Sequence, residues 1–405
     1  MSRDLDTLLA EVRRAESCTG CGVCTLLDPG LEMGLTDDGY LRPHRTAGTT
    51  PVPGAGERFA RVCPAVHVDA QRPEGSQRHP QLGPVVAVYE AAAADPELRR
   101  QGSSGGVLTA LSSWLVSTGE ASHVVGARAG ADEPRRTVPV RITSRDEALR
   151  AAGSRYAPVA VGSRGDVGPG AAVVGKPCEA TALRALELDE GRPGPLLLSF
   201  FCAGTPSQHA TTQLLDGLGV AGDEALDDLW YRGRGWPGRF TARTLQGREV
   251  SASYEESWGS TLGKQLQWRC KICPDGIGES SDITAGDFWR SDERGYPVFE
   301  ETDGYSALVV RTRRGADVVE RAVAAGVLTV RPITPDEVMA VQPLQRKRRA
   351  TLLGRLLGAR LAGTPVPRYR GFGLLGFAVR RPREIRDTVK DTFLRRRKVE
   401  RAHRR

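Results

Sequence analysis

The sequence predicts a mixed α/β protein in which a small thiol-rich module precedes a larger α/β domain. Three observations support this prediction. From Val85 to about Val330, apolar runs typical of buried strands alternate with segments of helical spacing. Before that, the chain combines closely spaced cysteines with residues 25–80, a stretch rich in Gly, Pro and Thr. The length, 405 residues, is enough for two or three domains and a sizeable core.

A predicted helix over residues 5–16 leads into the thiol run. Ser17–Cys24 reads S-C-T-G-C-G-V-C, so three thiols recur at intervals of three residues. A C-x2-C-x2-C run completed by Cys-Pro is the bacterial ferredoxin pattern for an iron–sulfur cluster, and Cys63-Pro64 provides the fourth thiol. The predicted ligands of this [4Fe–4S] cluster are Cys18, Cys21, Cys24 and Cys63.

A zinc site and disulfide bonds are the alternatives for these thiols. Structural zinc usually takes its sulfurs as separated C-x2-4-C pairs, which three thiols in one short run match poorly. The N-terminus, Met1–Asp6, lacks the apolar segment of a signal peptide, so the sequence predicts a cytoplasmic protein. Cysteines in that compartment more often serve metal or redox chemistry than disulfides.

Between the thiol module and the larger domain, Gln71–Pro84 is predicted to be a linker. It contains five residues that interrupt regular structure, namely Pro73, Gly75, Pro80, Gly83 and Pro84. The segment before it buries little apolar surface of its own, and a bound cluster would supply the missing cohesion.

The larger domain opens with a strand, a glycine-rich turn, a helix and a second strand. Their predicted ranges are Val85–Ala92, Gln101–Gly106, Val107–Leu115 and His123–Ala127. Gly105 and Gly106 would let backbone N–H groups approach a ligand, and the helix start favours phosphate. Ser103 or Ser104 could equally serve only as a helix cap. The turn matches neither G-x-G-x-x-G nor a P-loop, so by itself it does not identify a phosphate site.

Two further cysteines each follow a predicted buried strand. Cys178 comes after a strand over 171–175, and Cys202 after a strand over 196–201. Ligands of open α/β sheets bind at this end of the strands. Cys270–Pro274 adds a C-x2-C-P unit. Four such thiols suffice for a second [4Fe–4S] cluster, and zinc is the alternative because a single C-x2-C pair is common in zinc sites. The predicted ligands are Cys178, Cys202, Cys270 and Cys273.

The last part of the domain completes the α/β pattern. A predicted strand, Asp282–Trp289, has acidic residues whose side chains could hold a ribityl hydroxyl group or simply end the strand. A strand, a helix and a strand then follow over 306–311, 316–325 and 327–330.

Positive charge gathers at the C-terminus. The chain has a formal net charge of +8, and the excess lies after about residue 341, in several arginine-rich runs. Contact with an anionic membrane surface and an ordinary solvated basic face are both open for this segment. Nucleic-acid binding is not expected, because the arginine runs lack interleaved aromatic side chains. No apolar run reaches the roughly 18–20 residues needed to span a bilayer.

In order and spacing, these motifs resemble the coenzyme F420 hydrogenase/dehydrogenase beta-subunit family over about residues 10–340. The resemblance is carried by the N-terminal thiol run with Cys63-Pro64 and by six later motifs. The later motifs are Gly102–Gly106, Gly153–Tyr156, Gly175–Glu179, Phe201–Ser207, Cys270–Pro274 and Asp282–Trp289.

The resemblance implies an FAD domain with one [4Fe–4S] cluster, preceded by a ferredoxin-like module with another. The implied domains are a ferredoxin-like module over 1–75, an FAD-binding and iron–sulfur catalytic domain over 82–340, and a basic tail over 341–405. The residues that match the family's cofactor-binding motifs are Ser104, Gly105, Gly106, Tyr156 and Lys176. The module and the tail depart from shorter hydrogenase-type members, which puts membership of a hydrogenase complex in doubt.

The resemblance further implies an oxidoreductase that moves electrons between ferredoxin-type carriers and a hydride acceptor. Coenzyme F420 or a related organic molecule is the expected acceptor, and ferredoxin or a similar carrier is the expected partner. Iron–sulfur clusters pass single electrons while hydride acceptors take two, and a flavin can do both. A non-enzymatic alternative is a zinc-stabilised scaffold associated with surface-polysaccharide assembly, with its basic tail on the membrane.

Overall fold

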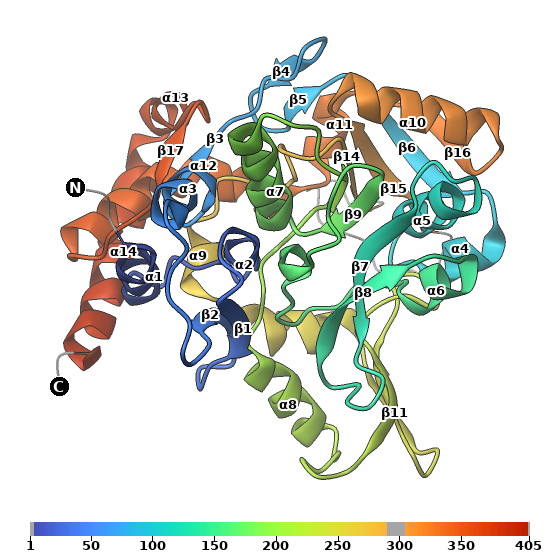
Figure 1. Ribbon diagram of the computed structural model, residues 1–405, viewed down its shortest axis with the longest axis horizontal. Coiled ribbons are helices and arrows are strands. Elements are labelled where there is room, and N and C mark those ends of the chain that lie inside the picture. The colour runs from blue at the N-terminus through green and yellow to red at the C-terminus, as the bar shows by residue number, and fades with distance from the viewer. Residues whose placement is uncertain (1–3, 290–303, 404–405) are drawn as a thin grey trace.

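A mixed eight-stranded sheet forms the centre of the protein. The computed structural model describes residues 4–289 and 304–403 (Figure 1). The strand order is β16-β6-β15-β14-β10-β9-β7-β8, and the four strands from β14 to β7 run parallel. In chain order the strands are β6 (Ala87–Ala93), β7 (His123–Ala129), β8 (Thr137–Ile142), β9 (Ala171–Gly175), β10 (Leu196–Phe200), β14 (Ile283–Asp287), β15 (Ser306–Val310) and β16 (Leu328–Pro332). The α/β class expected from the alternating apolar runs is confirmed.

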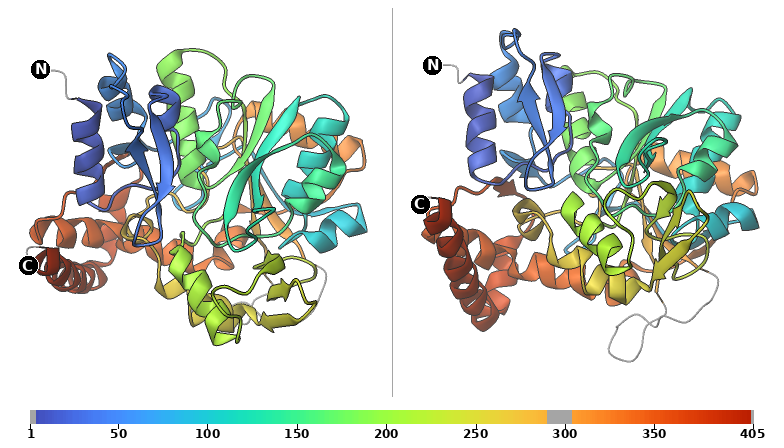
Figure 2. Two further views of the ribbon diagram at one scale, coloured as in Figure 1. Left: turned by 60° about the horizontal axis from the view of Figure 1, so that its bottom comes forward. Right: turned by 90° about the horizontal axis from the view of Figure 1, so that it is seen from below.

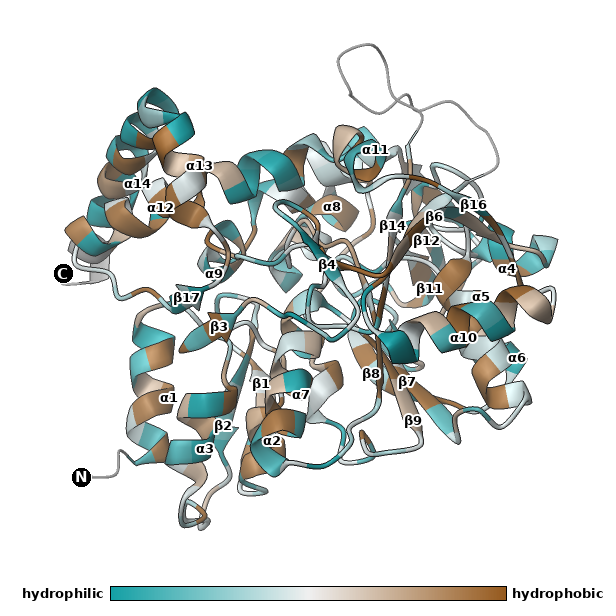
Figure 3. Ribbon diagram, turned by 90° about the horizontal axis from the view of Figure 1, so that it is seen from above, coloured by the Kyte–Doolittle hydropathy of each residue, from teal (hydrophilic) through white to brown (hydrophobic). Residues whose placement is uncertain are grey.

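Successive side chains of a strand point to opposite faces of the sheet, so neighbouring residues pack in different hydrophobic cores. Val124 packs with the helices of one face, and Val125 packs toward the N-terminal module on the other. The first face is covered by α4 (Pro96–Gln101), α5 (Val107–Ser117), α6 (Arg145–Arg150) and α10 (Arg313–Ala324). The opposite face is covered by α7 (Pro177–Glu190) and, farther along the sheet, by α11 (Pro335–Ala340). In Figure 3 the strands are largely apolar between these layers.

The N-terminal module packs against α7 rather than standing apart (Figure 2). Its elements are α1 (Leu5–Arg14), α2 (Cys24–Leu27), β1 (Leu31–Leu35), β2 (Leu41–Arg45), α3 (Ala55–Val62) and β3 (His67–Asp69). Arg58 and Arg61 of α3 form ion pairs with Asp189 at the end of α7, at 2.8 and 2.6 Å. The module and the larger domain therefore share one hydrophobic core.

The predicted linker contains a short hairpin instead of irregular chain. Strands β4 (Gln77–His79) and β5 (Gly83–Val85) pair antiparallel around a turn. Leu82 in that turn is fully buried with Val88 and Ile277. Burial of one apolar side chain thus accompanies regular structure in a segment whose prolines and glycines predicted a linker without it.

A small subdomain lies below the central sheet in the left view of Figure 2. It combines α8 (Gln208–Gly217) with a three-stranded antiparallel sheet, and its apolar core contains Leu215, Leu229 and Phe240. Its strands are β11 (Leu226–Trp230), β12 (Phe240–Thr244) and β13 (Glu249–Ala252). Three short elements return the chain to the main sheet, namely η2 (Glu255–Gly259), η3 (Leu262–Lys264) and α9 (Trp268–Lys271).

The basic C-terminal segment folds onto both parts of the molecule. It contains α12 (Pro343–Leu361), β17 (Arg368–Arg370), α13 (Leu374–Arg380) and α14 (Pro382–His403). Strand β17 pairs in parallel with β3 of the N-terminal module, while α12 packs on α11 and α14. In the described part of the chain, each helix is too short or too polar to cross a bilayer.

Two glycines let α12 and α14 approach closely. A Cβ at Gly354 would lie 3.0 Å from the Ile385 carbonyl oxygen, and one at Gly358 would lie 2.5 Å from that of Val389. A step of four residues along α12 corresponds to a step of four residues in the same sense along α14, so the two helices run in the same direction. We expect Gly358→Ala to destabilise the protein by about 1–3 kcal/mol, because overpacking outweighs the gain in helix propensity. Chemical denaturation measures the change.

Gly376→Ala on α13 is the matched control, since a Cβ there meets nothing within 4 Å. It should leave stability unchanged or raise it by up to about 1 kcal/mol. Equal effects of the two substitutions would contradict the close helix contact.

Candidate functional site

The first four cysteines converge on one small cavity in the N-terminal module. Cys18 and Cys21 lie in the loop after α1, Cys24 begins α2, and Cys63 follows α3. All four line the same cavity, whose other walls include Val12, Leu27, Phe59 and Val62. The loop is tight: Gly22 has φ +85°, and a Cβ there would lie 2.7 Å from Ser163 of the larger domain. Glycine is therefore required where the thiol run meets its neighbour.

Burial disfavours the thiolate form in this cavity. It raises the pKa of Cys21 to about 11 and that of Cys24 and Cys63 well above the ordinary value, and neighbouring thiols raise them further. Thiolates bind metals, so a positively charged metal centre is what could compensate four of them here.

The second four cysteines meet at the carboxyl end of the parallel strands. Cys178 lies in the first turn of α7 just after β9, Cys202 follows β10, Cys270 lies in α9, and Cys273 follows α9. The Cys270 sulfur accepts a hydrogen bond from the Thr205 backbone N–H at 3.3 Å. Burial, with added repulsion from Cys270, raises the pKa of Cys202 to about 12. The first four cysteines thus line one cavity, and in the second group Cys270 and Cys273 are near enough to Cys202 to act on its pKa.

The two groups are neighbours. The Gln267 amide donates to the Thr19 carbonyl oxygen at 3.1 Å and to the Cys270 sulfur at 3.5 Å, so one side chain touches both thiol loops. Arg269 donates to the carbonyl oxygen of Pro64, beside Cys63, at 3.0 Å. Burial raises the pKa of Cys178 well above its ordinary value. The nearby Lys176 ammonium lowers this pKa, whereas the charges of Glu179 and Cys21 raise it further.

Two buried guanidinium groups flank the second group without a carboxylate partner in the described ranges. Arg269 is 2% exposed, stacks near Tyr369, and its Nε has no hydrogen-bond partner there. Arg348 of α12 is 7% exposed and donates to the carbonyl oxygens of Cys202 and Ala203. Burying an uncompensated charge costs several kcal/mol. A [4Fe–4S] cluster held by four thiolates carries net negative charge, so it would fit between these cations.

Within residues 4–289 and 304–403, no three His, Cys, Asp or Glu side chains are close enough together to hold one metal ion. Neither group contains a disulfide, since all eight cysteines are free.

A cavity of about 410 Å³ opens beside the second thiol group. It lies where β9, β10 and β14 end and α5 begins, and its walls include Cys202 and Gly204. Four of the five expected cofactor-binding residues line it, namely Ser104, Gly106, Tyr156 and Lys176. Gly105 faces the sheet instead: its N–H donates to the Ser306 hydroxyl, and a Cβ would lie 2.5 Å from the Ala91 carbonyl oxygen.

Lys176 and Glu179 form a fully enclosed ion pair in the cavity wall. Their 2.6 Å contact joins side chains that are 7% and 0% exposed, and the Lys176 ammonium also donates to the Val159 carbonyl oxygen at 2.7 Å. Burial alone would lower the pKa of Lys176, but the Glu179 carboxylate raises it above the ordinary value. Lys176 is thus a fixed positive charge next to Cys178.

An aromatic wall with a central arginine closes another side of the cavity. Arg232 pairs with Asp287 at 2.7 Å, donates to the Ser103 carbonyl oxygen at 2.5 Å, and lies about 5.1 Å from the ring centres of both Tyr254 and Trp289. Arg232 is not recognisable from the sequence motifs. The one local sign is its glycine-rich neighbourhood, in which Gly233, Gly235 and Gly238 all have positive φ.

The acids of β14 have different surroundings. Asp287 lines the cavity through its pair with Arg232. Asp282 is buried beyond the cavity, where it accepts from the Leu197 N–H at 2.9 Å and from Arg184 at 3.0 Å. Of the two roles considered for these acids, Asp282 thus fits the end of a strand, and only Asp287 could face a ligand.

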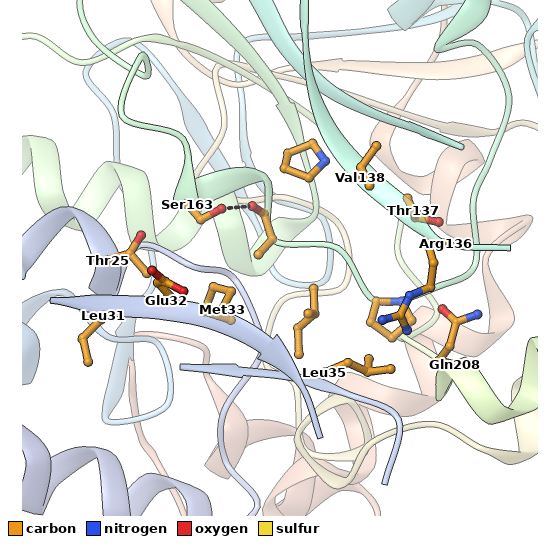
Figure 4. Close-up of a pocket in the computed structure, with 14 residues that line it drawn as sticks. Thr25, Leu31, Glu32, Met33, Leu35, Arg136, Thr137, Val138, Ser163 and Gln208 are labelled. Atoms are coloured by element: carbon orange, nitrogen blue, oxygen red, sulfur yellow. Dashed lines mark hydrogen bonds between the residues drawn. The ribbon is translucent and has the colours of Figure 1, made fainter. Parts of the chain in front are cut away.

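A second cavity of about 500 Å³ separates β1 from the edge strand β8 (Figure 4). Leu31, Met33 and Leu35 line one side, and Val138 lines the other. Thr137 lines both this groove and the cavity of about 410 Å³. The groove cannot be predicted from local sequence, because it exists only where the N-terminal module packs beside the central sheet.

Comparisons with known proteins match the larger domain. Two family models of the coenzyme F420 hydrogenase/dehydrogenase beta subunit match the chain in turn: the N-terminal model covers residues 88–163, and the C-terminal model covers residues 170–336. The coenzyme F420 hydrogenase subunit beta of Methanosarcina barkeri is 25% identical over 282 residues, which is 66% of this chain and 88% of the relative. That of Methanococcus voltae is 24% identical over 310 residues, 71% of this chain and 99% of the relative.

A structural likeness agrees with these matches. A chain of the F420-reducing [NiFe] hydrogenase complex from Methanosarcina barkeri aligns with a TM-score of 0.50 and 22% identity, over 69% of this chain and 95% of that one. At this identity the likeness speaks for the fold. Both family models leave residues 1–87 and 337–405 unmatched, so the ferredoxin-like nature of the module stays a prediction.

Removing one partner of the enclosed ion pair should be severe. We expect Lys176→Met to destabilise the protein by about 3–5 kcal/mol, because it leaves the Glu179 carboxylate buried without its cation. The double variant Lys176→Met/Glu179→Gln should recover part of that loss. Denaturation of the purified proteins measures both, and a double variant less stable than the single one would contradict the pairing.

Proposed function

This chain belongs to the coenzyme F420 hydrogenase/dehydrogenase beta-subunit family of oxidoreductases, and from that premise we propose that it moves electrons between ferredoxin-type carriers and a hydride acceptor. We propose coenzyme F420 or a related organic molecule as the acceptor. The observation that carries the proposal is that two thiol groups and the cavity of about 410 Å³ are neighbours: Gln267 touches both thiol loops, and Cys202 lies in the cavity wall.

In this proposal each part of the chain has a defined role. Two [4Fe–4S] clusters and FAD, when bound, would supply one-electron transfer and its conversion to hydride transfer. The first group of cysteines would hold one cluster and the second group the other. Ser104, Gly106 and Tyr156 would contact the flavin in the cavity of about 410 Å³ that they line. The apolar walls would keep water away from the thiolates.

The fixed charges around the cavity support an electron-accepting site. Lys176, Arg232 and Arg348 place three cations within or beside its walls, two of them balanced by Glu179 and Asp287. Positive charge favours the reduced, more negative state of a redox group. We propose that the hydride acceptor approaches by the groove of Figure 4, which shares Thr137 with the cavity wall.

The zinc-stabilised scaffold gains no support, since the relatives are oxidoreductase subunits. Cytoplasmic localisation and peripheral membrane contact remain predictions. A ferredoxin-type carrier is proposed as the partner on chemical grounds, because the expected cofactors exchange single electrons.

Cofactor content and route can be tested together. Protein purified without oxygen should contain about eight iron atoms per chain and a flavin spectrum, since each group of four thiols suits a [4Fe–4S] cluster. Cys21→Ser should abolish carrier-linked turnover and spare reduction of the flavin by dithionite. Colourless protein with bound zinc would contradict the proposal, and persistent carrier-linked turnover would contradict the route.

The charge of Arg348 should affect only the second cluster. Arg348→Gln keeps donors for the Cys202 carbonyl oxygen but removes a cation, so the reduction potential of that cluster should fall by about 60 mV or more, a tenfold change for a one-electron couple. Potentiometric titration followed by electron paramagnetic resonance measures it. Arg346→Gln, exposed on the same helix, is the control and should change neither potential. Equal shifts in both clusters would refute the assignment.

A further inference from the structure

A cluster of cations covers the loop that carries the second C-x2-C pair. We define the basic patch as Lys271, Arg355 and Arg395. Lys271 stands between Cys270 and Cys273, Arg355 of α12 donates to the Lys271 carbonyl oxygen at 2.7 Å, and Arg395 extends from α14. Lys271 and Arg395 are exposed and Arg355 is half-buried. Figures 1 and 3 show α9, α12 and α14 gathered at one end of the molecule.

The patch has uncompensated charge. Within the described chain, none of its three cations forms an ion pair with a carboxylate; Arg355 instead donates to a backbone carbonyl oxygen. Repulsion between like charges on a surface costs free energy, and a bound anionic group reduces that repulsion.

The patch lies over the boundary between the two thiol groups. Arg396, next to Arg395, bonds Glu16 at 2.7 Å and stacks over Trp268 at 4.7 Å. Glu16 is two residues before Cys18, and Trp268 is two residues before Cys270. A partner seated here would be next to both loops. Leu394, beside Arg395, and Leu357 and Leu361 of α12 are exposed apolar side chains of the same two helices.

We propose that the basic patch is the docking surface for a small acidic one-electron carrier protein. This inference rests on the proposed function and adds the place where the carrier binds. Charge complementarity selects an acidic partner, and the position over both thiol loops selects an electron carrier rather than an unrelated acidic protein. Arg355 and Arg395 lie beyond residue 336, where the matched family region ends, so the surface is a feature of this chain's C-terminal helices.

Calorimetry with a purified acidic bacterial ferredoxin tests the surface on the full-length holoprotein. Arg395→Glu should weaken binding by about tenfold or more at low salt, because it reverses an exposed charge that attracts the partner. Arg355→Gln should weaken binding less, because it only removes a half-buried charge. The difference between variant and wild type should shrink at about 0.5 M salt. Flavin reduction by dithionite should be unchanged in both variants.

Arg383→Glu, at the opposite end of α14, is the control and should bind ferredoxin as the wild type does. Wild-type affinity in Arg395→Glu, or equal loss in Arg383→Glu, would overturn the proposal. So would phosphatidylglycerol vesicles that bind the wild type and lose Arg395→Glu while ferredoxin affinity stays constant, since the patch would then serve a membrane. Iron and flavin content, measured on the same samples, reports separately on the proposed function.

Discussion

The cost of burying charge beside eight thiols is the constraint on which the rest of the structure depends. Burial favours the protonated state of several of these thiols, as the raised pKa values of Cys21 and Cys202 express. Yet Arg269 and Arg348 are buried next to the second group with carbonyl oxygens as their partners. Protonated thiols would leave these guanidinium groups unbalanced, whereas thiolates around an anionic cluster would balance them.

This constraint explains why the C-terminal helices belong to the site. Helix α12 carries Gln345 and Arg348, which both donate to the Cys202 carbonyl oxygen, and Arg349, which bonds Glu279 and the Pro274 carbonyl oxygen. The Tyr369 hydroxyl of β17 donates to the Ile272 carbonyl oxygen at 2.9 Å. The loops that carry Cys202, Cys270 and Cys273 are thus held in place by a segment that reads, in sequence, as a solvated basic tail.

What could be predicted from the sequence followed from local spacing. Apolar runs identified the central strands, and the spacing of Cys18–Cys24 and Cys270–Cys273 grouped thiols that the structure also groups. The contributions of Arg232, Arg269 and Arg348 could not be foreseen, because an arginine looks alike in a sequence whether it is solvated or buried. The burial of Leu82 could not be predicted either, because Leu82 packs in a core that is formed by residues from other segments of the chain.

The pairing of β3 with β17 joins strands from opposite ends of the chain. During synthesis, the edge of β3 emerges with no partner, and β17 follows about 300 residues later, on the order of tens of seconds at the usual rate of translation. An exposed strand edge invites pairing with other chains. The nascent N-terminal module therefore passes through an interval of aggregation risk, which ends only when β17 has emerged from the ribosome.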